Sequence, residues 1–517
     1  MKSPNSRQPS TNWFRSAMGW KPTWRLTGAL ISPARKLHLD ILQSIFVACL
    51  PTHRNCVMSA TEAPVLLGHI CSSWRSISLS TPRLWTRLHV AQPMRGPTPM
   101  ESSFEQKVVQ RIEVTKTWLG RSGQCPLSIS FHCPPENVQV PPPVVSRTSI
   151  QFLQALIPFA ARWQHIHLTT PTSSLLEVMS HVDIDIPWLE TVAFHHQPHS
   201  FDNELTWESS SFGILRGAQI SSLSFPGSIF KPDRLPLAWN QLTTLTIGGP
   251  WWTISPELTS ITLLDLLSRC HKLQCCKLMV RDLDLGMPVA QHPIVELPFL
   301  HTLAVHCVSM VAPAVSILLK RLSLPELRNF AFISGANHQG SPTLADFFAR
   351  STRLEGLDLD CRPFSKSTFL ESLHSLPPSI QRLRICDPDR GWGNLEGANS
   401  FDDETLTALT SSGICPALQH LSIDHGDHIS DEAILQFITA RRLESQTTLK
   451  RVDIYFRMRQ MTLDVMPSLQ PFIEAGLTVS LIYPPPFPLP QQSPWDGLAD
   501  APQVSPPGWP FPPMLEW

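Results

Sequence analysis

The sequence predicts an α/β protein in which three N-terminal helices precede an irregular solenoid built around a parallel sheet. Three observations predict this fold. Apolar residues recur at helical spacing within residues 32–90, an L-x-x-L-x-L pattern recurs from residue 163 onward, and the segments between its copies carry helix signals.

Composition limits the classes of function. Of the 517 residues, 42% are hydrophobic, which is enough for a sizeable core, and 41 Lys and Arg residues balance 42 Asp and Glu residues. Binding to nucleic acid or to an acidic membrane requires clustered positive charge, so we expect neither partner. No stretch reaches the ~18 consecutive apolar residues of a transmembrane helix. Twelve scattered cysteines without a C-x-x-C motif favour a reducing compartment, the cytoplasm or the nucleus.

Changes in composition divide the chain into five regions. We expect a disordered basic tail, a helical segment, a linking helix with a first strand, a repeat region and an extended proline-rich tail, at residues 1–31, 32–90, 91–160, 161–483 and 484–517. The opening residues superficially fit a mitochondrial transit peptide, but prolines interrupt any helix there, and a disordered tail is the better interpretation. The last region has twelve prolines in 34 positions.

The helical segment is expected to form three helices. In "LHLDILQSIFVACL" the apolar residues follow the spacing of a wide helical face, and Pro51 ends the helix. A second helix is expected from near Thr61. A third, short helix is expected at Thr81 and Pro82, where a capping hydroxyl precedes a proline at the first helical position. The apolar residues of these two helices are Leu66, Ile70, Trp74, Ile77, Leu84, Trp85 and Leu88.

These helices hold more apolar surface than they can bury. A unit of about 60 residues has little interior, yet this one carries two tryptophans and many branched aliphatic residues. Either the following domain or a separate protein must cover the surplus, and the pattern alone leaves both open.

Two motifs in this segment are specific in combination. "LHLDILQSIF" follows an L-P-x-E-I-L-x-x-I-F pattern, and "ICSSWRSISLSTPRLW" follows I-C-x-x-W-R-x-I-A-x-x-T-P-x-L-W. On these motifs, residues 37–90 resemble the F-box of basidiomycete F-box proteins, and Trp118–Ile129 is similar to a segment of the same group. His38 replaces the usual proline and Asp40 the usual glutamate. Loss of the proline loosens the start of the first helix but leaves its apolar face.

The resemblance implies a function in protein recruitment. Members of the F-box family dock on a Skp-type adaptor, which links them to a cullin and a RING protein. The chain is therefore expected to be the substrate-recognition subunit of an SCF-type ubiquitin ligase and not an enzyme. The candidates for adaptor binding, some of which are expected to belong to the F-box core instead, are Leu37, Leu39, Ile41, Leu42, Ile45, Phe46, Leu66, Ile70 and Trp74.

An alternative of a different class stays open. The chain would then be a protein-interaction scaffold outside any ligase, with its F-box as an internal packing unit, and His38 in place of proline motivates this interpretation. Exposure or burial of the apolar face between Leu37 and Phe46 discriminates between the two.

The repeat pattern predicts one strand per unit. Three consecutive gaps of 27 residues and one of 26 separate its copies between Leu273 and Ile380, close to the roughly 20–29-residue leucine-rich repeat. The asparagine that usually follows the strand is absent, so we expect an irregular solenoid. Segments such as "SPTLADFFARS" and "SFDDETLTALTS" suit returning helices, and Asp402 and Asp403 are placed at a helix N-terminus. The first positions of the copies are Trp163, Leu189, Ile220, Leu242, Leu273, Leu300, Leu327, Leu354, Ile380, Leu418 and Leu449.

Residues between the apolar strand positions are expected to face outward on the concave side of the sheet. In the early copies they are small or apolar, and in the later ones they are charged. They would form either a target-binding surface or a set of ordinary solvated strand positions. The target-binding candidates are Asp358, Asp360, Arg382, Arg384, His420, Asp424, Arg451, Asp453 and Tyr455.

No chemical motif supports catalysis. Nucleotide-binding, hydrolase, metalloprotease and kinase signatures are missing, so no catalytic residue and no cofactor is predicted. "HHQPH", which contains His195, His196 and His199, has the residue type of a zinc ligand. No cysteine or carboxylate lies within it, so histidines of an ordinary loop are the better interpretation and no metal site is predicted.

Overall fold

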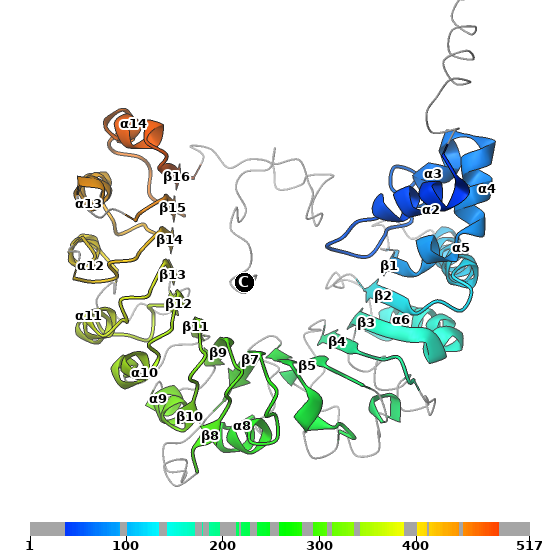
Figure 1. The fold of residues 1–517 in the computed structure, drawn as a ribbon, viewed down its shortest axis with the longest axis horizontal. Helices are drawn as coiled ribbons and strands as arrows, with labels where there is room; N and C mark the ends of the chain where they lie inside the picture. Colours follow the sequence, from blue (N-terminus) through cyan, green and yellow to red (C-terminus); the bar gives the residue numbers. More distant parts are fainter. Residues whose placement is uncertain are drawn as a thin grey trace, which may run out of the picture. The chain divides into compact units, whose positions relative to one another are not determined.

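The computed structural model describes residues 37–93, 101–133, 142–170, 178, 186–196, 213–216, 219–227, 235–248, 258–281, 293–307, 313–334, 342–386, 401–410, 413–443 and 448–484. The chain divides into two units, residues 1–130 and 131–517, and each is considered by itself. Figure 1 shows their elements. The predicted basic tail lies outside the described residues, as does nearly all of the proline-rich tail.

The first unit is mainly helical. Its described elements are α2 (Leu39–Ala48), α3 (Val65–Ile70), α4 (Ser72–Ser80), the 3₁₀ helix η2 (Pro82–Trp85), β1 (Arg87–Ala91) and α5 (Glu101–Arg121). Strand β2 (Leu127–His132) begins in this unit and crosses the boundary. The linking helix and first strand therefore lie where the sequence predicts them, whereas β1 was not predicted.

The predicted second helix is two helices. Cys71 has extended backbone angles and separates α3 from α4, and its sulfur accepts a hydrogen bond from the backbone N–H of Trp74, capping α4. The predicted helix start at Thr81 and Pro82 is confirmed, but the predicted capping by the Thr81 hydroxyl is wrong. The Thr81 hydroxyl donates backward to the carbonyl of Ile77 at 2.7 Å and makes no capping bond to the turn that starts at Pro82.

Aromatic side chains form much of the interior of the first unit. The rings of Trp85 and Trp118 meet edge-on with centroids 4.8 Å apart, and the guanidinium of Arg121 lies 4.7 Å from the centroid of the Trp85 ring. The indole N–H of Trp85 donates to the carbonyl of Ser78 at 2.9 Å, so this buried polar group is satisfied. The two tryptophans thereby tie α5 to the turn that follows α4.

The second unit is built around a parallel sheet. Its strands lie side by side in the order β3-β4-β5-β6-β7-β9-β11-β12-β13-β14-β15-β16. Each neighbouring pair among them is parallel. These strands are β3 (Trp163–Thr170), β4 (Thr191–His196), β5 (Ser222–Pro226), β6 (Thr244–Gly248), β7 (Cys275–Val280), β9 (Thr302–Cys307), β11 (Asn329–Ser334), β12 (Gly356–Asp360), β13 (Arg382–Cys386), β14 (His420–Asp424), β15 (Arg451–Tyr455) and β16 (Thr478–Ile482).

Helices return the chain between these strands. They are α6 (Pro142–Leu156), η3 (Ile157–Arg162), η4 (Gly213–Leu215), η7 (Trp239–Gln241), α8 (Ser260–Leu267), α9 (Pro313–Lys320), α10 (Ala345–Arg350), α11 (Lys366–His374), α12 (Asp403–Ala408), α13 (Asp431–Leu443) and α14 (Met466–Glu474). A separate pair, β8 (Val295–Glu296) with β10 (Leu322–Ser323), joins two of the connections. Helices α9 to α14 lie on the outer side of the sheet, and the opposite face of the strands forms its inner side (Figure 1).

Strand positions follow the repeat pattern closely. Ten of the eleven predicted copies have a strand that begins two residues after the first position, as Gly356 follows Leu354 and Arg382 follows Ile380. The apolar pair of each copy, such as Leu357 and Leu359, is buried on the helix side. One parallel strand per unit with returning helices is the arrangement of a leucine-rich-repeat solenoid. No described helix is both long and apolar enough to cross a membrane.

Candidate protein-binding surfaces

Helix α2 presents two different apolar stripes. Leu42 and Phe46, four residues apart, are buried, and the Phe46 ring lies 4.8 Å from the ring of Trp74. Ile41 and Ile45, one position before each, are 51% and 43% exposed. Because residues four apart share a face of a helix, α2 uses one face for the core and leaves an adjacent one uncovered.

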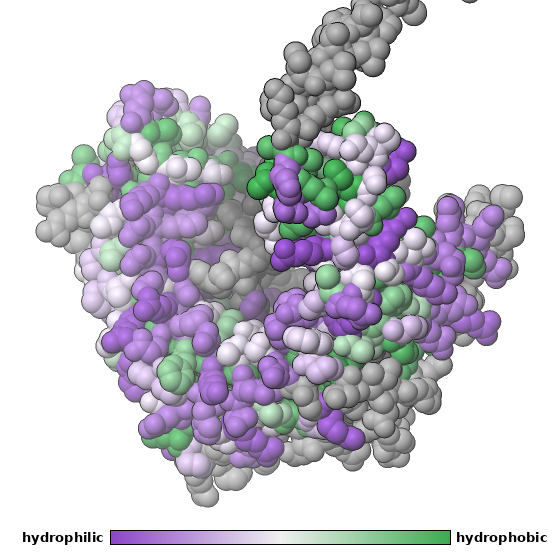
Figure 2. Space-filling model, turned by 45° about the vertical axis from the view of Figure 1, so that its right-hand side comes forward, coloured by the Kyte–Doolittle hydropathy of each residue, from purple (hydrophilic) through white to green (hydrophobic). Residues whose placement is uncertain are grey.

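The next helices also expose apolar side chains. Leu37 and Leu39 precede the exposed stripe of α2, Leu66 and Ile70 expose the same kind of surface on α3, and Leu79 does so on α4. Figure 2 shows hydrophobic surface gathered over this part of the first unit. We call the set Leu37, Leu39, Ile41, Ile45, Leu66 and Ile70 the N-terminal apolar face.

Three of the nine adaptor-binding candidates are not part of this face. Leu42 and Phe46 are buried and belong to the core, and Trp74 is only partly exposed because it packs on Phe46. The other six are all exposed by 39% or more. Helical spacing alone identified the apolar positions but did not separate the two stripes.

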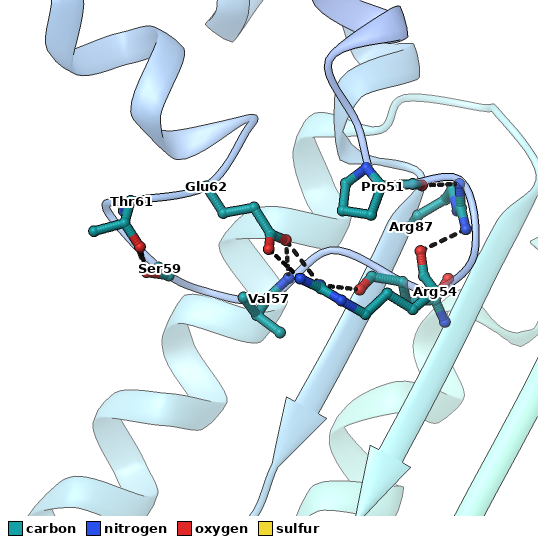
Figure 3. Close-up of polar contacts among 8 residues, drawn as sticks. Pro51, Arg54, Val57, Ser59, Thr61, Glu62 and Arg87 are labelled. Carbon is teal, nitrogen blue, oxygen red and sulfur yellow. Dashed lines mark hydrogen bonds and ion pairs between the residues drawn. The ribbon is translucent and has the colours of Figure 1, made fainter. Parts of the chain in front are cut away.

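The connection between α2 and α3 is held by charge (Figure 3). Arg54 donates from its two terminal nitrogens to the two carboxylate oxygens of Glu62 at 3.1 and 2.5 Å, and Glu62 also accepts from the N–H of Val57. Burial raises the pKa of Glu62, but these hydrogen bonds outweigh it and hold the pKa below its usual value. Arg87 of β1 donates to the carbonyls of Pro51 and Arg54 and so fixes the start of the connection, while the Arg54–Glu62 pair ties that start to its end.

The second surface is the inner face of the sheet in the C-terminal repeats. Strand register aligns its side chains in rows across β12–β15. One row runs through Gly356, Arg382, His420 and Arg451; the next runs through Asp358, Arg384, Ser422 and Asp453; the third runs through Asp360, Cys386, Asp424 and Tyr455.

The carboxylates on this face are buried, contrary to the expectation of solvated outward positions. Asp358, Asp360, Asp424 and Asp453 are each 2% exposed or less. A buried carboxylate is costly unless it is paired, and three of the four are paired. The cations between them stay more exposed, with Arg382 and Arg451 at the surface.

Each paired carboxylate has a distinct partner. Asp424 accepts two hydrogen bonds from Arg384, at 2.6 and 3.2 Å. Asp360 accepts from the Arg362 guanidinium and from the N–H of Ser334, which joins β12 to β11.

Asp453 is shared between two neighbours. It accepts from Nε2 of His420 at 2.7 Å and from Nε of Arg451 at 2.6 Å. Burial raises the pKa of Asp453, but these bonds outweigh it and lower the pKa overall. In the same row as His420 and Arg451, Arg382 bonds Asn329 at 2.8 Å, reaching across β12 at the position of Gly356, which has no side chain to block it.

Asp358 differs from the other three. Both of its carboxylate oxygens are buried and accept no hydrogen bond. Burial raises its pKa to about 7; Arg384 opposes this shift, and Asp424 and Asp360 add to it. In the next strands, Oγ of Ser422 and one oxygen each of Asp424 and Asp453 are likewise buried and unpartnered.

One strongly connected residue was not predicted. Asp431, at the start of α13, accepts hydrogen bonds from the N–H groups of Thr462 and Leu463, from the Thr462 hydroxyl and from the Tyr483 hydroxyl. It also pairs with Arg459 at 2.8 Å. Its place at a helix start, in "SDEAIL", was the available signal. Asp402 caps α12 by accepting from the N–H of Thr405, in agreement with the prediction.

The histidine motif brings no metal site together among the described residues. His195 lies on β4, with its ring centroid 4.6 Å from that of His167 on β3, and burial lowers the pKa of His195 to about 4. His199 lies outside the described residues. Within the described part of the chain no group of three or more potential metal ligands forms.

Comparison with known proteins does not assign a family. No family model and no curated protein matches the chain. Among solved structures, the Rad7 and Elc1 complex in yeast is similar over 82% of this chain and 96% of the other, with 12% identity and a TM-score of 0.42. A complex of TLR13 with ssRNA13 is similar over 62% of this chain and 45% of the other, with 14% identity and a TM-score of 0.28. At these TM-scores the similarities carry no argument about function.

Proposed function

We propose that the chain is the substrate-recognition subunit of an SCF-type ubiquitin ligase, with residues 37–90 as an F-box that binds a Skp-type adaptor. The mechanism is positioning. The F-box holds the adaptor, the repeats hold a protein target, and the transfer chemistry occurs on the cullin and RING subunits.

The observation that carries the proposal is the exposure of the N-terminal apolar face. A soluble protein rarely leaves a contiguous set of large aliphatic side chains in water, so such a set marks a contact with another molecule. The motifs of residues 37–90 point to the adaptor as that molecule. The alternative, a scaffold with an internal F-box, would require another part of the chain to cover this face.

Co-purification tests the proposal. The full chain is co-expressed with a Skp-type adaptor and cullin, and wild type is expected to recover both. Ile45→Asp is expected to lose them, because a charge would be buried in an apolar contact. Val109→Asp on α5, which is 61% exposed, is the matched control and is expected to behave as wild type. Trp74→Ala is expected to lose the adaptor as well, because it removes the Phe46 contact that supports α2 beneath the face. Recovery of the adaptor by both Ile45→Asp and Trp74→Ala would refute the proposal.

A further inference from the structure

We propose that the inner face of β12–β15 binds a basic segment of the target. In this complex the charged group of one Lys or Arg side chain of the segment lies against Asp358. This inference rests on the proposed target-binding role of the repeats and names the chemistry of the target.

The first step is the surplus of acceptors. Arg384 serves Asp424, while His420 and Arg451 serve Asp453. Asp358 is 1% exposed, and both of its oxygens lack a hydrogen bond. Ser422, in the same row and 6% exposed, also has an unpartnered oxygen. The unpartnered oxygens of Asp358, Asp424 and Asp453 are acceptors, and the Ser422 hydroxyl can accept as well as donate, so the ligand that complements them is a donor.

The second step is the charge. An unpaired carboxylate in the interior is stabilised most by a cation that also donates hydrogen bonds. Metal ions are disfavoured, because the described residues contain no cluster of three metal ligands. An ammonium or guanidinium group meets both requirements, and a guanidinium can serve both oxygens of Asp358 at once.

The third step is the reach. Since almost none of Asp358 is exposed, the ligand must carry its charge below the surface, and the neighbouring side chains must open for it. Lys and Arg do this with long apolar stems. The unpartnered oxygens of Asp424 and Asp453 lie two and three strands away from Asp358 on the same face, at about 4.8 Å per strand. A single side chain cannot serve them all, which favours an extended segment with more than one basic residue.

Peptide selection tests the inference. The full-length chain, bound to its adaptor where the adaptor binds, is used to select random linear peptides by display. Selected peptides are expected to share Lys or Arg, and Asp358→Asn is expected to weaken a selected peptide by at least about tenfold, the value of a charge-assisted hydrogen bond. Asp346→Asn on α10, whose side chain is 72% exposed and pairs with Lys320, is the matched control and is expected to bind as wild type.

Three results would overturn the inference. These are selected peptides without a shared basic residue, enrichment of acidic peptides, or unchanged affinity in Asp358→Asn. A full-length variant with the seven Lys and Arg residues of positions 1–36 replaced by Gln identifies a competing occupant. Basic peptides selected only by this variant would assign the face to the chain's own N-terminal segment instead of a target.

The two proposals fail separately. Adaptor recovery is read on the same preparations. Basic peptides that depend on Asp358 without adaptor binding would support the site and refute the ligase role, whereas adaptor binding without such peptides would do the reverse.

Discussion

Arg384 donates two hydrogen bonds to Asp424 on β14, although Asp358 is the residue that faces it across the β12–β13 pair. The guanidinium therefore pairs away from its register partner, and Asp358 is left with a buried carboxylate that accepts nothing. The unpaired carboxylate lowers the free energy of unfolding of the chain, and this effect can be measured.

Replacing Asp358 by Asn is expected to stabilise the chain at high pH. Burial, with Asp424 and Asp360 nearby, raises the pKa of Asp358 from 3.8 to about 7. The folded chain thus binds this proton more tightly than the unfolded chain, and the free energy of unfolding falls as pH rises between about 4 and about 7. At about 1.4 kcal/mol per pKa unit, the loss is on the order of 4 kcal/mol.

Urea unfolding at pH 5 and pH 8 measures this effect. Asp358→Asn is expected to exceed wild type at pH 8 and to show a smaller loss between the two pH values, while Asp346→Asn follows wild type. A variant less stable than wild type at pH 8 would mean that Asp358 is paired in the free chain.

Replacing Asp431 is expected to have the opposite effect. Burial raises the pKa of Asp431, but hydrogen bonds led by those from Thr462 and Tyr483 lower it far more. Its stabilisation is therefore present above the unfolded pKa near 3.8 and is lost as pH falls below that value. Asp431→Asn is expected to cost about 3 kcal/mol at pH 7, since it breaks a buried ion pair.

Tyr483→Phe tests the same cluster of hydrogen bonds with a smaller change than Asp431→Asn. It removes one hydrogen bond of 2.7 Å and is expected to cost about 1 kcal/mol. Equal losses in the two variants would show that the Tyr483 contact, and not the carboxylate as a whole, holds this end of the sheet.

Replacing a core residue of α2 is expected to lower stability, whereas replacing a residue of its exposed stripe is not. Phe46→Ala should cost about 3–5 kcal/mol, because it opens a cavity beside Trp74. Ile41→Asp should change stability little, since Ile41 is 51% exposed. Hydrogen exchange in α2 and α4 measures the stability of this unit, and a large acceleration in Ile41→Asp would contradict the division of α2 into two stripes.

The Arg54–Glu62 pair is expected to order the connection before α3. Glu62→Gln removes a charge-assisted pair and should cost about 1 kcal/mol, seen as faster hydrogen exchange at Val57 and Leu66. Glu113→Gln is the control, because Glu113 is 63% exposed and pairs only on the surface of α5 with Lys116. Identical exchange in wild type and Glu62→Gln would show that Arg87 alone holds the connection.

Much of the fold could be predicted from the sequence because apolar spacing sets strand and helix positions. The L-x-x-L-x-L copies located strands such as β12 and β13, since the buried pair of each copy must face the helices. Strand β16 was missed because Thr478–Ile482 falls outside the last recognised copy, and β1 because it follows directly on η2. The break at Cys71 was hidden because the apolar spacing continues through it.

The sites were harder to predict, because their side-chain contacts join residues that are far apart in the sequence. Spacing places Leu42 and Ile41 on neighbouring faces of one helix but does not say which face the unit buries. Asp358 and Arg384 face each other across the β12–β13 pair, yet the hydrogen bonds of Arg384 run to Asp424, 40 residues away along the chain. Register between separate strands, which the sequence does not state, decides such contacts.

Calorimetric titration of the full chain with a purified Skp-type adaptor tests the central claim most directly. Wild type is expected to bind, and Ile41→Asp is expected to raise the dissociation constant at least about tenfold, because the N-terminal apolar face would then bury a charge. Val109→Asp is expected to match wild type. Binding by Ile41→Asp that equals wild type, or no binding by wild type, would contradict the assignment of this face to the adaptor.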